Sequence, residues 1–578
     1  MPAHPKPLRP SFHALLVALV LAVVAFMLAC PRRDDPSSGK PATSTSTSST
    51  PAVAPVQLEV AFSSEKKDWA DEAIQEFNAS ATKTANGAVI SVHATYTGSV
   101  EPIAGIIAGT LKPHVFSPAS SLVLPLLDDQ WTGAKGATAK PIVGTSEPLV
   151  LSPVVVAMWQ PMATALGYPG KKLGWSDIAA LAKSTDGWRG KGHPEWGDFR
   201  FGHTHPGYSN SGLIAVLAEY YAAVGKTRDL DPADIAAPKS SEFVRAIEGA
   251  VVHYGRSTGF FYNALADHGP AYLSAAVLYE NVVVASAMPS NPKSLPFPLV
   301  AIYPKEGTQW ADHPYAILDA PWVGAQEKEA AIKLKAYLLS RPIQERAMQK
   351  YGFRSALTDV ALGAPIDAAH GADPKEPQTL LSTPNLRTLR AVLDGWNETK
   401  RGVDVIIVFD RSGSMQGERV TAAREGLITF LNTLKPTDRA QLMTFNAALD
   451  PPTPEAPPAE LVDTVKGIFA DGGTALYDAV LKARDLAVAG AKGDKRRIHA
   501  VVVLTDGEDR DSHISFDDLL EKLGTAEQGS AVRIFTIGYG DEADAKILGT
   551  IATKSGAAYY HGDPKNIQAI YDEIASFF

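Results

Sequence analysis

Short apolar runs alternate with amphipathic segments along the last third of the chain. The run VDVIIVF at 403–409 has branched apolar side chains through its centre. A short, continuous run of this kind predicts a strand that is buried on both faces, as in a parallel sheet. Comparable runs lie at 440–445, 498–504 and 532–538, and segments of helical period separate them. Strands that alternate with helices predict a doubly wound α/β sheet, to which we assign residues 401–578.

Polar residues at the ends of these runs have the composition of a cation site. Asp410 ends the first strand, and Ser412 and Ser414 follow at alternate positions of a turn. Thr474 opens a later helix, and Asp506 follows another buried strand. The carboxyl ends of parallel strands meet at one edge of an open sheet, so we expect these oxygen atoms to converge. Hard divalent cations such as Mg2+ prefer carboxylate and hydroxyl oxygens.

The D-x-S-x-S motif of Asp410, Ser412 and Ser414, together with Thr474 and Asp506, resembles the metal-ion-dependent adhesion site of von Willebrand factor A domains. The resemblance implies that these residues bind Mg2+, or Ca2+ or Mn2+ in its place. It also implies that a protein partner offers an Asp or Glu to the open coordination position of the ion. An A domain that keeps the fold and binds no metal is the alternative. Since no His, Lys or Cys stands beside these motifs to act as base or nucleophile, we expect a binding module and no enzyme.

Residues 56–356 form a larger α/β region in which a strand, a serine-containing turn and a helix recur. The segment 56–62 alternates as a strand, and 66–78 has an apolar stripe at helical spacing. The strongly apolar segments 151–159 and 299–304 are predicted to cross between two lobes.

This order of elements resembles the bacterial extracellular solute-binding proteins, the two-lobed periplasmic type that is associated with transporters. The resemblance implies a first lobe of 56–148 and 300–356, a second lobe of 149–299, and a solute cleft between them. It rests on the Ser63-Ser64 turn, the segment GHTHPGYSNSG at 202–212, Tyr279-Glu280-Asn281 and the closing YLLS…YGFR segment.

The turns that would line this cleft offer hydroxyls and backbone amides, without a basic side chain. Ser209, Asn210 and Ser211 precede an apolar helix, whose N-terminus attracts anions through its free amides and its dipole. We therefore expect a small oxyanion or a polar neutral solute, with helix capping alone as the alternative. The candidate cleft residues are Ser63, Ser64, Gly98, Ser99, Ser120, Ser209, Asn210, Ser211 and Glu280.

Two histidines, His203 and His205, flank Thr204 just ahead of this helix. A metal-binding pair is conceivable there. Because no cysteine is nearby and Pro206 interrupts the segment, we expect solvated loop histidines.

The N-terminal segment has the layout of a secretory signal. Lys6 and Arg9 precede sixteen uncharged apolar residues, 14–29, and Cys30 follows at once. The layout resembles a bacterial lipoprotein signal at 1–30, with Cys30 as the lipidated residue. An uncleaved membrane anchor is the alternative, although sixteen residues are fewer than the ~20 that span a membrane comfortably. The Ser-, Thr- and Pro-rich segment that follows, 31–55, is predicted to be a flexible linker.

Length and charge narrow the functional classes. The chain has 578 residues and a net charge of −9, so no basic footprint argues for nucleic acid. Residues 357–400 are predicted to be a connector that docks against a neighbouring domain. The resemblances together imply a membrane-tethered, extracytoplasmic binding protein of the cell envelope that captures a protein partner. The alternative is a solute receptor for a membrane permease, with the A domain as a docking or regulatory module.

Overall fold

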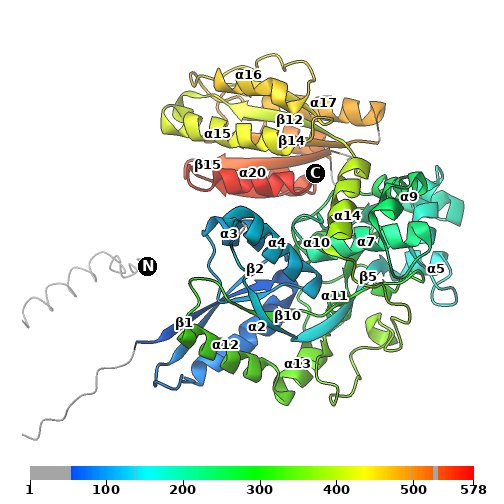
Figure 1. The fold of residues 1–578 in the computed structure, drawn as a ribbon. Coiled ribbons are helices and arrows are strands. Elements are labelled where there is room, and N and C mark those ends of the chain that lie inside the picture. The colour runs from blue at the N-terminus through cyan, green and yellow to red at the C-terminus, as the bar shows by residue number, and fades with distance from the viewer. Residues whose placement is uncertain (1–53, 137, 495, 525–531) are drawn as a thin grey trace, which may run out of the picture. The chain divides into compact units, whose positions relative to one another are not determined.

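The computed structural model describes residues 54–136, 138–494, 496–524 and 532–578 (Figure 1). The predicted signal, Cys30 and nearly all of the predicted linker lie outside these residues. Within the described part of the chain, no helix has both the length and the apolar character needed to cross a membrane.

Lobe one is built on a sheet with the strand order β2-β1-β3-β10-β4. Alternate residues of β1 face two different layers. Val60 and Phe62 pack with α2 and α12, whereas Ala61 packs on the side of α3 and α4. The elements are β1 (Val56–Ser63), α2 (Lys67–Ala79), β2 (Ile90–Thr97), α3 (Pro102–Ala108), β3 (Val115–Ser117), α4 (Leu124–Lys135), β4 (Val143–Pro148), β10 (Pro314–Leu318), α12 (Ala325–Leu338) and α13 (Arg341–Tyr351). The first three strands of the chain, β1, β2 and β3, are parallel, and β10 runs antiparallel to both of its neighbours.

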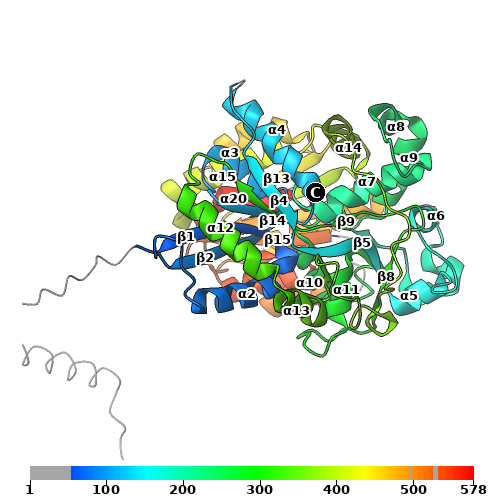
Figure 2. The ribbon, with the colours of Figure 1, turned by 60° about the horizontal axis from the view of Figure 1, so that its bottom comes forward.

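Lobe two surrounds a long central strand, β5 (Val150–Trp159), which is buried along almost its whole length. It pairs antiparallel with β7, β8, β9 and β11, and β6 adds to β7 in parallel. The other elements are α5 (Gln160–Ala165), α6 (Trp175–Lys183), β6 (Phe201–Gly202), α7 (Asn210–Val224), α8 (Pro232–Ala236), α9 (Pro238–Glu248), α10 (Thr258–His268), β7 (Ala275–Tyr279), α11 (Glu280–Ser286), β8 (Leu299–Ile302), β9 (Trp310–Ala311) and β11 (Arg354–Ser355). Figure 2 shows this lobe from a second direction.

Within its described residues, the chain crosses between the lobes three times, the third time between α13 of lobe one and β11 of lobe two. The first two crossings are adjacent. Leu149 separates β4 from β5, and His313 lies between β9 and β10. The Leu149 amide donates to the His313 carbonyl at 3.1 Å, so the two crossings lie side by side. His313 has a φ of 39°, a left-handed conformation that costs a residue with a side chain about 1 kcal/mol or more.

The predictions that 151–159 and 299–304 cross between the lobes are wrong. The first segment lies in β5, the central strand of lobe two, and the strand of the second, β8, pairs with β5 inside the same lobe. The return to lobe one occurs at His313, about ten residues later than the sequence pattern indicated, so the predicted lobe boundary at 300 is also wrong. An apolar run marks a buried strand but carries no information about the sheet in which that strand lies.

The segment 357–400 follows the surface of lobe two. Its Leu381 amide donates to the carbonyl of Thr308 at 2.8 Å, and the Ser382 amide donates to that of Thr227 at 2.9 Å. The segment ends in α14 (Leu386–Thr399), which packs against α7, α8 and α9. Trp396 of this helix lies fully buried against Tyr254.

The C-terminal sheet is parallel throughout, in the order β13-β12-β14-β15-β16. Its centre is β12, in which Val405 and Ile407 face one layer and Ile406 and Val408 the other. α15 and α20 cover the first face, and α17, α18 and α19 cover the second, which confirms the doubly wound fold (Figure 1). The elements are β12 (Val403–Asp410), α15 (Glu418–Thr433), β13 (Arg439–Phe445), α16 (Val462–Lys466), α17 (Leu476–Gly493), β14 (Ile498–Thr505), α18 (Phe516–Leu523), β15 (Val532–Tyr539), α19 (Ala545–Lys554), β16 (Tyr559–Gly562) and α20 (Ile567–Ala575).

The edge strand β13 is covered by the proline-rich segment 451–458. The Ala440 amide donates to Ala456 at 2.8 Å, and the Thr453 amide donates to Leu442 at 2.9 Å. A proline-rich cover of this kind protects an edge without extending the sheet.

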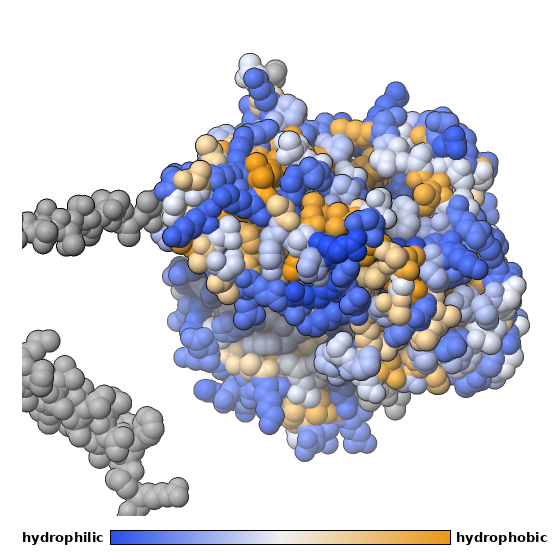
Figure 3. Space-filling model, turned by 90° about the horizontal axis from the view of Figure 1, so that it is seen from below, coloured by the Kyte–Doolittle hydropathy of each residue, from blue (hydrophilic) through white to orange (hydrophobic). Residues whose placement is uncertain are grey.

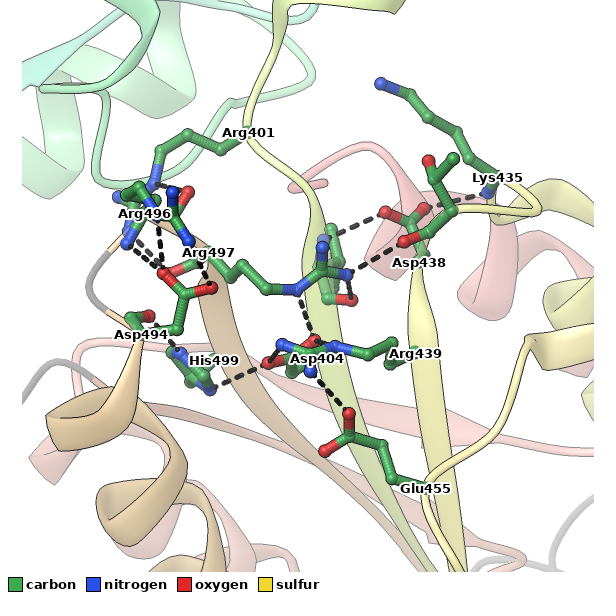
Figure 4. Close-up of polar contacts among 12 residues, drawn as sticks. Arg401, Asp404, Lys435, Asp438, Arg439, Glu455, Asp494, Arg496, Arg497 and His499 are labelled. Atoms are coloured by element: carbon green, nitrogen blue, oxygen red, sulfur yellow. Dashed lines mark hydrogen bonds and ion pairs between the residues drawn. The ribbon is translucent and has the colours of Figure 1, made fainter.

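A network of charged residues closes the amino-terminal end of the same sheet (Figure 4). Asp404, at the start of β12, accepts hydrogen bonds from Arg439 at 2.7 and 2.8 Å and from Arg497 at 2.5 Å. Arg401 donates to the carbonyl of Val251 at 2.8 Å and so connects this end of the sheet to lobe two. The network lies at the opposite end of β12 from Asp410, so the charges that hold the sheet are kept apart from the candidate site.

Apolar residues are dispersed over the one face of the molecule that Figure 3 shows. On the face in Figure 3, hydrophilic residues surround separate apolar patches. Among the described residues, Phe469 is the most exposed large apolar side chain, at 78%. It lies in the loop that leads to Thr474.

Candidate functional site

Two buried carboxylates meet at the carboxyl-terminal edge of the C-terminal sheet. Asp410 ends β12 and Asp506 follows β14, and these two strands are adjacent and parallel. Both side chains are fully buried. The parallel register therefore brings together two acids that are far apart in the sequence.

Hydroxyl groups join the two carboxylates into one cluster. Asp410 accepts hydrogen bonds from the Ser412 amide at 2.7 Å and from the Thr505 hydroxyl at 2.5 Å. Ser414 donates to Asp506 at 2.7 Å, and its hydroxyl oxygen lies 3.1 Å from that of Ser412. Four of the five residues predicted to bind a metal thus form a continuous polar cluster.

The fifth residue, Thr474, comes from a different loop. Its amide donates to Asp511 at 2.7 Å, and the Gly413 amide donates to the carbonyl of Gly472 at 3.0 Å, which holds this loop against the serine turn. A Cβ on Gly507 would lie 3.7 Å from the Thr474 hydroxyl and 3.8 Å from that of Ser414. The two hydroxyls therefore flank the same short stretch of backbone, and the structure brings Thr474 to the cluster.

The electrostatics of the cluster fit a cation. The pKa of Asp410 is raised to about 6, chiefly by burial and to a smaller extent by the neighbouring Asp506, against the lowering effect of the hydrogen bonds from Thr505 and Ser412. A divalent cation would stabilise both carboxylates in their charged form. Two carboxylates and three hydroxyls are oxygen donors of the type that Mg2+ prefers.

Arg419 is a member of this site that the sequence did not reveal. From the first turn of α15, its guanidinium donates to Asp506 at 3.0 Å and to Glu542 at 3.0 Å. It is about one-third exposed. Its place in the helix that follows the D-x-S-x-S turn is the only signal in the sequence, and that signal does not show that its side chain folds back onto Asp506.

The predicted solute-cleft residues lie on turns where the two lobes touch. A Cβ on Gly98 would lie 2.4 Å from the carbonyl oxygen of Tyr208, and the Val100 amide donates to the same carbonyl at 3.0 Å. Ser64 faces Gly259 in a similar way, since a Cβ on that glycine would lie 3.6 Å from the Ser64 hydroxyl. The approach at Gly98 needs a residue without a Cβ, whereas the one at Gly259 is an ordinary van der Waals distance.

Several of the predicted cleft residues have protein partners. Ser63 donates to Glu65, Ser99 accepts from the Ala119 amide at 2.9 Å, and Ser120 accepts from the Leu122 amide at 3.2 Å. On lobe two, Asn210 donates to Tyr279 at 3.1 Å, and the hydroxyl oxygen of Ser211 lies 2.8 Å from that of Thr258. Ser209 is the N-cap of α7, without a side-chain capping bond.

Glu280 has a different role from the one the sequence indicated. Arg354 donates to its two oxygens at 2.7 and 2.6 Å, Tyr303 donates to it as well, and the carboxylate is fully buried. Glu280 therefore forms an internal ion pair with Arg354, so we leave it out of the solute site.

The expectation that no basic residue lines these turns is wrong. Lys66 follows the Ser63-Ser64 turn, is fully buried, and donates to the carbonyls of Ser117 at 2.7 Å and Pro118 at 2.9 Å. Burial lowers the pKa of its ammonium group to about 7, against the opposite effect of Glu65 and Asp312. Glu65, the buried acid that precedes Lys66 in the sequence, lies 3.2 Å from the imidazole of His313.

The family comparison agrees with this two-lobed architecture. The family described as "Bacterial extracellular solute-binding protein" matches residues 58–354, just over half of the 578-residue chain. The chain belongs to this family. Behind the solute-binding region, a "von Willebrand factor type A domain" matches residues 404–573. Membership of the solute-binding family indicates an extracytoplasmic location and a role in binding.

Individual relatives match one half of this solute-binding protein or the other. Inter-alpha-trypsin inhibitor heavy chain H4 from Homo sapiens is 28% identical over 187 residues, which is 30% of this chain and 20% of that protein. The chain thus spans about a fifth of the curated relatives that it matches first. Among solved structures, the periplasmic binding protein P5PA covers 59% of this chain and 99% of its own, with 13% identity and a TM-score of 0.40. The protein BatB from Bacteroides thetaiotaomicron covers 30% and 98%, with 19% identity and a TM-score of 0.26.

Proposed function

We propose that this protein is a membrane-tethered binding protein of the cell envelope that captures an acidic group on a protein partner. In this proposal Mg2+ is held by Asp410, Ser412, Ser414, Thr474 and Asp506, and lipidated Cys30 tethers the chain. The observation that carries the proposal is the cluster of two buried carboxylates and serine hydroxyls at the sheet edge.

The charge of the cluster explains why an acidic partner is expected. Asp410 and Asp506 balance the charge of a divalent cation, and the hydroxyls add no charge. An ion held in this way has its charge satisfied but can accept a further oxygen ligand. A carboxylate from a partner fits this position better than a basic group does, because it is an anionic oxygen donor.

The loop next to the cluster supports a protein partner. Phe469 is 78% exposed and precedes Thr474 by five residues. Exposed aromatic side chains beside a polar site are frequent anchors in protein interfaces.

Site-specific photocrosslinking tests this proposal on the full chain in cells. A photoreactive residue at position 469 is expected to crosslink an envelope protein when Mg2+ is present. The crosslink should disappear on chelation and in Asp410→Ala. It should persist in Asp471→Asn, a control at a neighbouring acid that is exposed and pairs with Arg411. Crosslinks of equal yield with and without Mg2+ would contradict capture through the metal.

A second candidate function is that of a solute receptor for a membrane permease, with the A domain as a docking or regulatory module. It is favoured by buried polar atoms near the junction of the lobes: the Ser64 hydroxyl and the Asn210 side-chain oxygen have no hydrogen-bond partner among the described residues. Lys66 adds a buried cation to the same turn. A small oxyanion would fit these groups, as would a polar neutral molecule.

Native mass spectrometry of the full chain separates the two functions. A small organic or oxyanion mass that survives chelation, and that is lost in Lys66→Met, is expected of a solute receptor. A chain that loses only the mass of Mg2+ on chelation would contradict the receptor function and leave partner capture as the function of the protein.

A further inference from the structure

Lobe two contains a cluster of side chains of the types that bind metal ions, remote in the sequence from the cluster at Asp410. His203, Glu219 and Glu248 are each fully buried. One potential ligand atom from each lies within 4.8 Å of the other two. His203 follows β6, Glu219 belongs to α7 and Glu248 ends α9, and these two helices pack against each other (Figure 1).

The tautomer of His203 prepares its ring for a cation. Its Nδ1 lies 2.8 Å from the carbonyl oxygen of Thr204, which can only accept a hydrogen bond, so Nδ1 carries a proton. In the neutral ring Nε2 then presents a lone pair, and it lies 3.0 Å from Oε1 of Glu248. Two lone-pair donors that face each other at this distance need a cation or an additional proton between them. Histidines that bind metals commonly donate their other ring N–H to a backbone carbonyl in this way.

Glu219 gives an independent indication of a ligand. Both of its carboxylate oxygens are buried, and neither has a hydrogen-bond partner among the described residues. The residue interrupts the apolar sequence LIAVLAEYYAAV of α7, whose side chains are buried along most of the helix. A buried carboxylate without a partner is costly, so this position calls for a group that it can bind.

The remaining contacts orient the cluster without neutralising it. Tyr254 donates to the second oxygen of Glu248 at 2.6 Å, which fixes the direction of that carboxylate. Lys400 and Lys435 interact electrostatically with Glu248, but their ammonium groups donate to the backbone carbonyls of Phe578 and Asn397. With His203 neutral and both carboxylates ionised, the cluster would carry a charge of −2, which one divalent cation balances.

We propose that His203, Glu219 and Glu248 form a buried site for a divalent transition-metal ion such as Zn2+, with Tyr254 as a positioning residue. One imidazole nitrogen and two carboxylates form a ligand set that suits Zn2+, whereas Mg2+ prefers oxygen ligands alone. The site is structural: it ties α7 and α9 to the segment after β6. It is independent of the partner capture proposed for the A domain.

The first test is the metal content of the full chain, expressed in medium that contains Zn2+ and purified in Asp410→Ala form so that the strand-end site does not contribute. Elemental analysis is expected to find one Zn2+ per chain. Growth with Co2+ in place of Zn2+ should give the visible absorption bands of a bound Co2+ ion. If the Asp410→Ala protein holds neither Zn2+ nor Co2+, the proposal is overturned, and a proton occupies the cluster instead.

The second test uses isosteric variants. Glu219→Gln keeps the shape of the side chain and removes its charge, and it should lower the bound Zn2+ at least about tenfold. Glu195→Gln is the matched control, since Glu195 also lies 3.0 Å from a histidine, His193, but is exposed. Equal Zn2+ content in Glu219→Gln and Glu195→Gln would overturn the assignment even if Zn2+ were bound elsewhere.

Discussion

The guanidinium of Arg256 donates to the carboxylate of Glu101 at 2.7 Å and so joins lobe two to lobe one. A second nitrogen of the same guanidinium lies 3.7 Å from Glu573, in α20 of the A domain. Arg256 is about one-quarter exposed, so solvent screens these pairs only in part. One side chain thus contacts both lobes of the solute-binding region and the module that follows it.

Removing the ion pair between Arg256 and Glu101 should favour an open arrangement, in which the two lobes lie further apart. In Arg256→Met the Glu101 carboxylate loses its partner, and a partly exposed ion pair of about 1 kcal/mol corresponds to a shift of about fivefold in the open population. Spin labels at Asn86 and Lys239, which are exposed residues on the two lobes, measure the distance between the lobes. A larger open population should appear as a larger fraction of long distances between the labels. Arg245→Met, at an exposed arginine of lobe two, should leave the distances unchanged. A distance distribution in Arg256→Met identical to that of the wild type would contradict the role assigned to this arginine.

Asp410→Ala should abolish Mg2+ binding at the sheet edge. The substitution removes one of two carboxylates and leaves Ser412 and Thr505 without the acceptor that orders them. Titration calorimetry with Mg2+ checks this outcome, with Asp471→Asn as a control at the same edge. Retained Mg2+ binding in Asp410→Ala would show that the ion is held elsewhere.

Arg419→Met should strengthen Mg2+ binding. Its guanidinium competes with a metal for Asp506, and the pair is about one-third exposed on the arginine side, so removing it is expected to lower the dissociation constant by up to about fivefold. Arg484→Met is the control, because Arg484 pairs only with its sequence neighbour Asp485 among the ion pairs of the described residues. Weaker Mg2+ binding in Arg419→Met would mean that the arginine supports the site and does not compete with the ion.

Stability should rise between pH 7 and pH 10 because of Lys66. Burial lowers its pKa from 10.5 to about 7 in the folded state. Between these values the unfolded chain binds a proton that the folded chain lacks, so the free energy of unfolding increases with pH. The cost of burying Lys66 is therefore largest below pH 7 and vanishes above the unfolded pKa.

Denaturant titrations at several pH values measure this effect. Lys66→Met should reduce the gain in the free energy of unfolding by a few kcal/mol, at about 1.4 kcal/mol per pKa unit. Burial lowers the pKa of Lys400 to about 7 and that of Lys435 to about 8. These two lysines should therefore preserve part of the increase of the free energy of unfolding with pH in Lys66→Met. Lys67→Met is the control at an exposed neighbour that pairs with Asp71. An unchanged slope in Lys66→Met would show that Lys66 is already accessible to water.

Sequence patterns located most strands closely. The predicted runs at 440–445, 498–504 and 532–538 each lie within one residue of β13, β14 and β15. The segment 324–352 folds as two helices, α12 and α13, which separate at Ser340 just before Arg341-Pro342. Proline at the second helical position starts a helix readily but cannot continue the one before it.

The histidines ahead of α7 show where local reasoning failed. His203 is fully buried beside Glu248, and the half-buried His205 packs against Trp396, so the prediction of solvated loop histidines is wrong. Pro206 did mark a break in regular structure, but Glu248 of α9 contacts His203, Trp396 of α14 contacts His205, and Tyr254 packs against both rings. The acid within the apolar helix, Glu219, was the available signal, since a charge in such a helix needs a partner.

The sequence by itself determined the order of elements, the doubly wound A domain and the five oxygen-bearing residues at its edge. These depend on short-range patterns: apolar period, turn chemistry and the carboxyl ends of parallel strands. Only the tertiary structure decided where the chain crosses between the lobes, that Arg419 reaches Asp506, that Lys66 is buried, and that His203 meets Glu219 and Glu248. Each of these depends on the approach of residues from different elements, and that approach is fixed by packing in three dimensions.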